Sequence, residues 1–156
     1  MAAGGRSRGA SGAGASRAGL GLRLLAAALG VFFVALATDK IGWLTDGNIL
    51  RERFGRAVAD ARPAVRWYLE TIVFPGAPLF ARLVPLAECV AGLALLLGFW
   101  PRIGAGLALF LVLNVHFADG SYWHVAFLRN GYGLPVIGGL LALVVSGRNL
   151  PWSVKP

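Results

Sequence analysis

Long apolar segments separated by short polar ones constrain this chain more than any other feature. We expect transmembrane helices at about residues 20–38, 79–100, 103–118 and 131–146. An α-helix needs about 20 apolar residues to span roughly 30 Å of hydrocarbon. Charged residues make up only 14% of the chain, too few to cover a water-soluble globule. The sequence therefore predicts an all-α, polytopic membrane protein, a four-transmembrane-helix bundle in a lipid bilayer.

The segment before the first apolar run has a different composition. Residues 1–18 are almost entirely Gly, Ala, Ser and Arg, and such a segment cannot bury enough surface to fold, so we expect a disordered basic tail. For residues 20–38 a cleaved secretory signal is the alternative, because Ala35-Leu36-Ala37 resembles a cleavage site. The apolar segment is long for a signal, so we favour a retained helix. Residues 19–150 should form the membrane domain and residues 151–156 a short tail.

Residues 39–76 are too polar to span a membrane and form a long first loop. Apolar residues recur in it every three or four positions, a spacing typical of amphipathic helices. We expect two short amphipathic helices that rest on the membrane surface, or alternatively two solvated helices with a small core of their own. The apolar positions are Leu50, Phe54 and Val58, then Val65, Leu69 and Ile72.

The formal charge of +8 raises the question of nucleic-acid binding. The arginines lie at the ends of the apolar segments, where membrane proteins meet lipid headgroups. No basic patch is interleaved with aromatic residues, so no nucleic-acid partner is expected. The first helix usually dominates orientation, and its leading tail is purely basic. The sequence therefore predicts a multi-pass protein with cytoplasmic termini.

Glu88 is the most informative polar residue, because an acidic side chain within a membrane helix is costly and is a functional candidate by default. The turn at Pro101 should bring residues thirteen positions before and after it to the same depth, which pairs Glu88 with Asn114. His116 lies only about 3 Å further along the axis. These groups could hydrogen-bond one another and fix the bundle's register. In the functional alternative, Glu88 and His116 are catalytic, and Glu88 exchanges a proton with His116 or with a bound quinone.

Further polar residues should gather at the same end of the bundle as this layer. Among them we expect Lys40, Asp39 and Arg129 to act with Asn114 in binding. The single cysteine excludes an internal disulfide or a Cys-rich metal site, and the spacing of His116 and His124 indicates no metal centre. The whole set is Asp39, Lys40, Asp119, His124, Arg129 and Asn130.

Three motifs resemble the DoxX family of membrane proteins. The segment from Glu88 to Arg102, with a glutamate, a glycine, a leucine run, a second glycine and an arginine, is similar to the second-helix pattern of that family. Asp39-Lys40 is similar to the lysine that these proteins carry after their first helix. The segment from Ser146 to Leu150 resembles their glycine-arginine exit from the fourth helix. The resemblance covers about residues 20–150.

The resemblance implies a four-helix protein of the bacterial inner membrane. DoxD relatives are subunits of a thiosulfate:quinone oxidoreductase, so it also implies a membrane subunit or accessory of a quinone-linked (thiosulfate or thiol) redox system, with quinone as the cofactor and a redox protein as the partner. The long arginine-rich loop and the lack of paired cysteines depart from the family. The alternative is a non-catalytic scaffold that recruits a partner protein through residues 39–76. The matching positions are Lys40, Glu88 and the structural candidates Gly92, Gly98 and Arg102.

Overall fold

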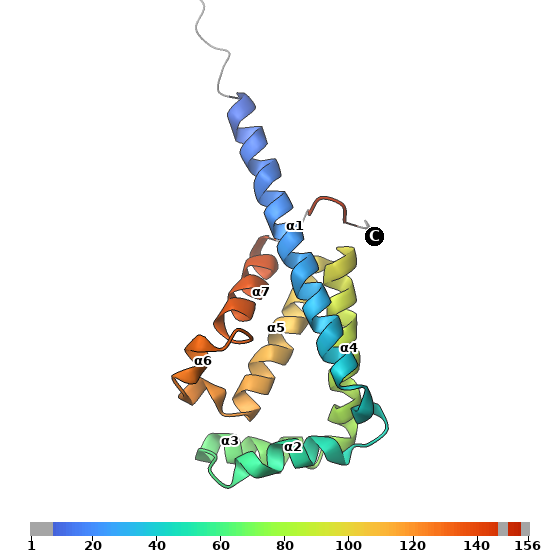
Figure 1. Cartoon of the computed structure of the whole chain (residues 1–156), viewed down its shortest axis with the longest axis vertical. Helices are drawn as coiled ribbons and strands as arrows, with labels where there is room; N and C mark the ends of the chain where they lie inside the picture. The colour runs from blue at the N-terminus through green and yellow to red at the C-terminus, as the bar shows by residue number, and fades with distance from the viewer. Residues whose placement is uncertain (1–7, 147–149, 154–156) are drawn as a thin grey trace, which may run out of the picture.

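The computed structural model describes residues 8–146 and 150–153, and all regular elements in these ranges are helices. Four of them run side by side, as Figure 1 shows: α1 (Arg8–Asp39), α4 (Ala77–Leu97), α5 (Pro101–Ala118) and α7 (Leu134–Ser146). The all-α prediction is confirmed for the described residues. The shorter elements are η1 (Ile41–Leu44), α2 (Asn48–Val58), α3 (Pro63–Tyr68), η2 (Leu69–Val73), η3 (Ser121–Trp123) and α6 (Ala126–Arg129).

Three helices in the described part of the chain are long and apolar enough to cross a membrane. They are Arg17–Asp39 within α1, Ala77–Leu97 and Pro101–Ala118. The fourth apolar helix, α7, has 13 residues and is therefore only about 20 Å long at 1.5 Å per residue. It begins at Leu134 rather than near residue 131 because Pro135 suits a first helical turn, where its missing N–H is not needed.

The first helix is longer than the sequence indicated. α1 begins at Arg8, so the prediction of a disordered tail over residues 1–18 is wrong for residues 8–18; residues 1–7 lie outside the described residues. Extending an existing helix adds one hydrogen bond per residue without a new nucleation step. The alanines and arginines of this stretch are also good helix formers. Composition alone therefore underestimated the influence of the neighbouring apolar helix.

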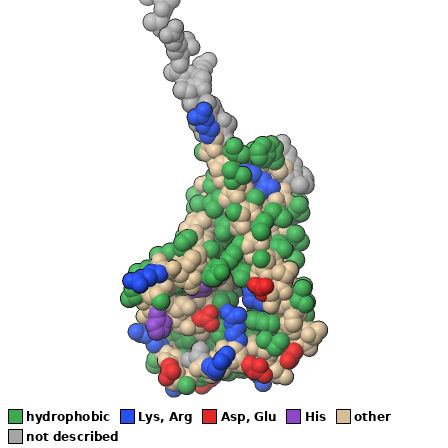
Figure 2. Space-filling model, in the orientation of Figure 1, with side chains coloured by type: hydrophobic (Ala, Val, Ile, Leu, Met, Phe, Trp, Pro, Cys, Tyr) green, Lys and Arg blue, Asp and Glu red, His purple; other side chains and the backbone are tan. Residues whose placement is uncertain are grey.

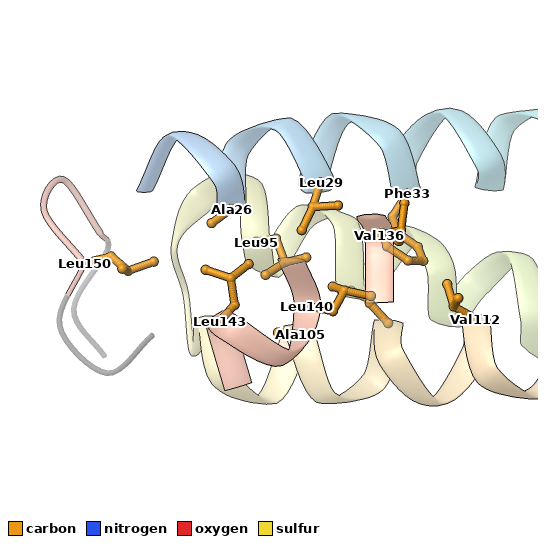
Figure 3. Packing of buried hydrophobic residues seen from close by; sticks show 12 residues of the cluster. Ala26, Leu29, Phe33, Leu95, Ala105, Val112, Val136, Leu140, Leu143 and Leu150 are labelled. Atoms are coloured by element: carbon orange, nitrogen blue, oxygen red, sulfur yellow. The ribbon is translucent and has the colours of Figure 1, made fainter. Parts of the chain in front are cut away.

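The helices pack around a bundle core of small and branched apolar side chains. Figure 3 shows Leu29 and Phe33 of α1, Leu95 of α4 and Leu140 of α7 pointing into the space between the helices. In a membrane, close packing of this kind replaces the hydrophobic effect as the force that holds helices together. The buried residues of the bundle core are Ala26, Leu29, Phe33, Ala91, Leu95, Ala105, Ala108, Val112, Val136, Leu140, Leu143 and Leu150.

α1 and α4 approach each other closely at a pair of glycines. A Cβ placed on Gly30 would lie 2.7 Å from the backbone nitrogen of Leu96 and 2.8 Å from the carbonyl oxygen of Gly92. A Cβ on Gly92 would lie 2.8 Å from the backbone nitrogen of Val34. All three obstacles are backbone atoms, so any side chain at Gly30 or Gly92 would push the helices apart.

Two arginines tie the end of the bundle that carries the termini. Arg23 of α1 donates from Nη1 and Nη2 to the carbonyl oxygens of Leu95 and Leu96, at 3.0 and 2.6 Å. Arg102 of α5 donates from Nε to the carbonyl oxygen of Val144 at 2.7 Å. The last carbonyls of a helix lack partners within it, and a cation there interacts favourably with the helix dipole. Each arginine therefore closes the C-terminal end of a neighbouring helix.

The opposite end of the bundle is covered by α2, α3 and η2. Figure 1 shows α2 and α3 lying across that end, and Figure 2 shows many charged side chains gathered there. Their apolar side chains join Ala77 and Ala81 of α4 and Ala118 of α5 in what we call the end cluster. Residues 39–76 are thus packed onto the bundle. The remaining buried members of the end cluster are Trp43, Leu50, Phe54, Val65, Leu69 and Val73.

Candidate functional site

A cavity of about 770 Å³ lies between the bundle and the helices that cover its end. Most of its wall is apolar, with side chains from α1, α4 and α5 facing one another. Its size is within the range of small-molecule binding sites, which are typically apolar with a few polar groups. Its apolar lining includes Phe32, Leu36, Leu83, Ala87, Leu107 and Phe110.

A buried ion pair forms part of the cavity wall. Lys40 Nζ donates to both carboxylate oxygens of Glu88, at 2.8 and 2.7 Å. Lys40 is 8% exposed and Glu88 is 3% exposed. Each charge is therefore compensated at short range, which a buried charge requires. Both residues line the cavity, so the pair is also the most polar feature that a ligand would meet.

Local structure explains why these two side chains meet. α1 ends at Asp39, and the Lys40 side chain turns back so that Nζ also lies 3.3 Å from the carbonyl oxygen of Leu36 in the last turn of α1. A cation is favourable at a helix C-terminus. Glu88 lies on the inward face of α4, which also carries Ala81, Ala91 and other buried residues at helical spacing. The pair thus joins the end of α1 to the middle of α4.

His116 also lines the cavity, but it has no polar partner. It is 8% exposed, and neither ring nitrogen has a hydrogen-bond partner among the residues that the structure describes. Its ring packs edge-on against Phe127, with ring centroids 5.3 Å apart, and lies 6.0 Å from the ring of Tyr122. Buried polar atoms are nearly always hydrogen-bonded in proteins. The imidazole is therefore an unusual part of this wall.

Four further residues with polar groups line the cavity: Tyr68, Asn114, Arg53 and Asp119. Tyr68 Oη lies 2.7 Å from Nδ2 and 3.0 Å from Oδ1 of Asn114, which joins α3 to α5. Arg53 and Asp119 also line the cavity. Desolvation raises the pKa of the Asp119 carboxyl above its ordinary value, and the positive charge of Arg53 and the nearby His116 act in the opposite direction. The four charged residues of the lining are two cations and two anions.

The structure brings four of the predicted site residues together. Lys40, Glu88, Asn114 and His116 all line the cavity. Glu88 and Asn114 nevertheless have different partners, because Glu88 pairs with Lys40 and Asn114 with Tyr68. The Lys40–Glu88 contact is a hydrogen bond of the kind that the structural alternative predicts, whereas Asn114 bonds to a residue outside the predicted set.

The other predicted site residues lie elsewhere. Asp39 and Arg129 are exposed and do not line the cavity. Asp39 precedes Lys40 by one residue, and one residue of helix turns the side-chain direction by about 100°. Gly92 lies at the contact between α1 and α4. Gly98 ends α4 in the left-handed conformation with φ 71°, and Arg102 closes α7. None of the three lines the cavity.

Several residues of the segment 39–76 line the cavity although the sequence did not predict them as site residues. Trp43, Arg53 and Tyr68 line the cavity, and the Arg53 guanidinium lies 5.7 Å from the centroid of the Trp43 ring. Trp43 and Tyr68 gave a signal in the sequence, because aromatic residues are unusual in a solvated loop. Whether they line the cavity depends on the surface against which residues 39–76 pack, and the apolar spacing within that segment does not indicate that surface.

No known protein family, curated protein or solved structure matches this chain. A function for the chain therefore has to be argued from the cavity and from the residues that line it.

Proposed function

We propose that this chain is a DoxX-like membrane subunit or accessory of a quinone-linked redox system in a bacterial inner membrane. The observation that supports the proposal is the apolar cavity with the Lys40–Glu88 pair in its wall. A quinone combines an apolar body with two carbonyl oxygens, and the lining offers matching surfaces for both. The nitrogens of His116 have no partner in the described part of the chain and add hydrogen-bonding capacity to the wall.

In this proposal the chain crosses the bilayer four times, with α7 as a short fourth span. A helix of 13 residues can cross where the bilayer thins locally or where flanking residues reach the interface. α7 runs beside α5 and α1, so it belongs to the same bundle. Arg23 and Arg102 lie at the end that carries the termini. Lys and Arg residues are almost evenly divided between the two ends, so the purely basic tail that leads into the first helix is what favours a cytoplasmic location for that end.

The proposed ligand would reach the cavity from the lipid. Leu83 of α4 and Phe110 of α5 both line the cavity, although they are 48% and 64% exposed. An apolar side chain that is exposed on the outside of a membrane bundle faces acyl chains. The cavity therefore has an apolar border on the lipid side, and a lipid-soluble molecule would not have to cross water to enter it.

The residues of the pair would assist the chemistry without supplying electrons. A bound quinone accepts two electrons and two protons to become a quinol. Glu88 is placed to hold or pass a proton, and Lys40, which donates to both of its carboxylate oxygens, stabilises its charged form. The chain has one cysteine, Cys89, which cannot form the intramolecular disulfide of a two-electron thiol couple. The electrons would come from thiosulfate or a thiol through a partner protein.

Filling the cavity should block quinone reduction without disturbing the ion pair. Ala87 lines the cavity, and the neighbouring Leu86 is exposed and does not line it. We expect Ala87→Phe to slow quinone reduction by at least about tenfold, because excluding a ligand's ring removes binding that is worth more than about 1.4 kcal/mol. The measurement is reduction of decyl-benzoquinone by the complex purified from its own membranes, with thiosulfate or a thiol as donor. Leu86→Phe is the matched control and should leave the rate unchanged.

Equal rates for Ala87→Phe, Leu86→Phe and the unaltered chain would contradict the proposal. They would favour the scaffold alternative if charge reversal at Arg56 also dispersed the complex. Arg56 is an exposed residue of α2 and is not part of the cavity lining. The scaffold alternative has less support, because the end cluster buries six apolar side chains of residues 39–76 against the bundle.

A further inference from the structure

His116 is a buried polar side chain of the cavity wall that has no hydrogen-bond partner among the described residues. Its two ring nitrogens are shielded and unbonded within the described residues, while the other buried polar residues, Lys40 and Glu88, satisfy each other. A neutral imidazole has one N–H donor and one acceptor nitrogen. Leaving both imidazole nitrogens without a hydrogen bond in a buried wall is unfavourable. A ligand that bonds to them from outside the chain would remove this cost.

The charges of the lining restrict what that partner can be. Lys40 and Arg53 are balanced by Glu88 and Asp119, and Lys40 is fully engaged with Glu88. A ligand with a net charge would enter this apolar space without an uncommitted buried counter-charge, which is strongly unfavourable. A neutral head with a hydrogen-bonding oxygen meets no such penalty.

We infer that His116 binds the polar head of a neutral, lipid-soluble ligand whose head carries a carbonyl or hydroxyl oxygen, and that His116 thereby sets which ligands the cavity accepts. The apolar body of the ligand lies against side chains such as Phe32, Leu107 and Phe110. Phe127 packs edge-on against the imidazole and limits the directions in which the ring can turn. The inference deepens the proposed function and rests on it.

The test measures binding by the full-length chain in lipid nanodiscs, without any redox partner. Trp43 lines the cavity, so a bound quinone should quench its fluorescence. The probe is decyl-benzoquinone, and decylbenzene and decanoate are competitors with the same tail and an apolar or an anionic head. His116→Leu removes the hydrogen-bonding nitrogens. His124→Leu is the control, because His124 is exposed and does not line the cavity.

We expect the Kd for decyl-benzoquinone to rise about tenfold in His116→Leu, the change that loss of one hydrogen bond produces. It should stay unchanged in His124→Leu. Competition by decylbenzene should be the same in all three proteins, because the apolar wall is intact. His116→Gln keeps one donor and one acceptor and should recover part of the affinity, which also covers the case in which His116→Leu folds poorly.

Each other outcome overturns a defined part of this account. Equal quinone affinity in the unaltered chain, His116→Leu and His116→Gln would overturn the role of His116 and leave the proposed function standing. Absence of saturable quinone binding to the unaltered chain would overturn both. Stronger competition by decanoate than by decylbenzene would show that the site prefers an anionic head, contrary to the inference.

Discussion

Replacing Glu88 by leucine alone should lower the free energy of unfolding by about 3–5 kcal/mol, the usual cost of removing one partner from a buried ion pair. The loss arises because Lys40 would remain in a wall where it is 8% exposed, without its counter-charge. Lys40→Met alone should have an effect of similar size on Glu88. The double variant Lys40→Met/Glu88→Leu should lie close to the unaltered chain, since replacing both charges by apolar groups is often neutral or stabilising.

The measurement is a double-mutant cycle, with reversible unfolding followed by helix content in mixed detergent micelles. A coupling of several kcal/mol between the two positions is expected, because each single variant leaves a buried charge that the double variant removes. Additive losses in the double variant would contradict the pairing of Lys40 with Glu88. The rate of quinone reduction is also measured in the double variant. Because this variant should keep the fold while lacking the ion pair, a lower rate would show that the pair contributes to the reaction and not only to stability.

Gly92→Ala should destabilise the bundle by about 1–3 kcal/mol, the range found when extra methyl groups are forced into a packed core. The added Cβ would lie 2.8 Å from the backbone nitrogen of Val34 and 2.9 Å from the carbonyl oxygen of Gly30. Because these are backbone atoms, relief requires α1 and α4 to separate. That movement would also strain the ion pair that joins the end of α1 to α4.

The control for this prediction is Gly106→Ala in α5, where nothing lies within 4 Å of the added Cβ. There, alanine should be neutral or should stabilise the helix by up to about 1 kcal/mol through its higher helix propensity. Thermal unfolding in one detergent compares the two variants. If Gly92→Ala melted at or above the temperature of Gly106→Ala, the close contact between α1 and α4 would be wrong.

The bundle divides into a tightly packed half and an open half. Leu95, Leu140 and Leu143 fill the half near the termini, and Arg23 closes the end of α4 there. In the other half, α2 and α3 cover the end of the bundle (Figure 1) and the cavity lies between them and the long helices. The rigid half therefore fixes the helices, and the open half leaves space for a ligand.

The sequence predicted the parts of this arrangement that depend on local pattern. Long apolar segments located α4 and α5 to within a few residues, and the turn before Pro101 placed Glu88 and Asn114 at a similar depth, where both line one cavity. A helical hairpin has a fixed rise per residue, so equal distances from its turn give equal depths. Lys40 was expected at the same end of the bundle and also matched the family pattern, but its contact with Glu88, which spans 48 positions in the chain, was not predicted.

The remaining features depend on long-range packing. Tyr68 reaches Asn114 across 46 positions, and Arg53 lines the cavity only because α2 lies under the bundle. Asp39 and Arg129 looked equivalent to Lys40 by their place in the sequence, yet they are exposed. The direction of the side chain changes by about 100° from one helical residue to the next. The sequence alone therefore does not show which of two neighbouring residues at the end of a helix faces the cavity.

Photo-crosslinking in membranes tests whether this chain holds a lipid-soluble ligand beside the Lys40–Glu88 pair. The probe is an azido-benzoquinone with a decyl tail, and labelled peptides are identified by mass spectrometry. The account predicts saturable labelling of residues 83–88 and 107–116 that excess decyl-benzoquinone abolishes. Labelling that is confined to outward-facing residues such as Val31 and Val145, which are exposed, and that resists competition would contradict it.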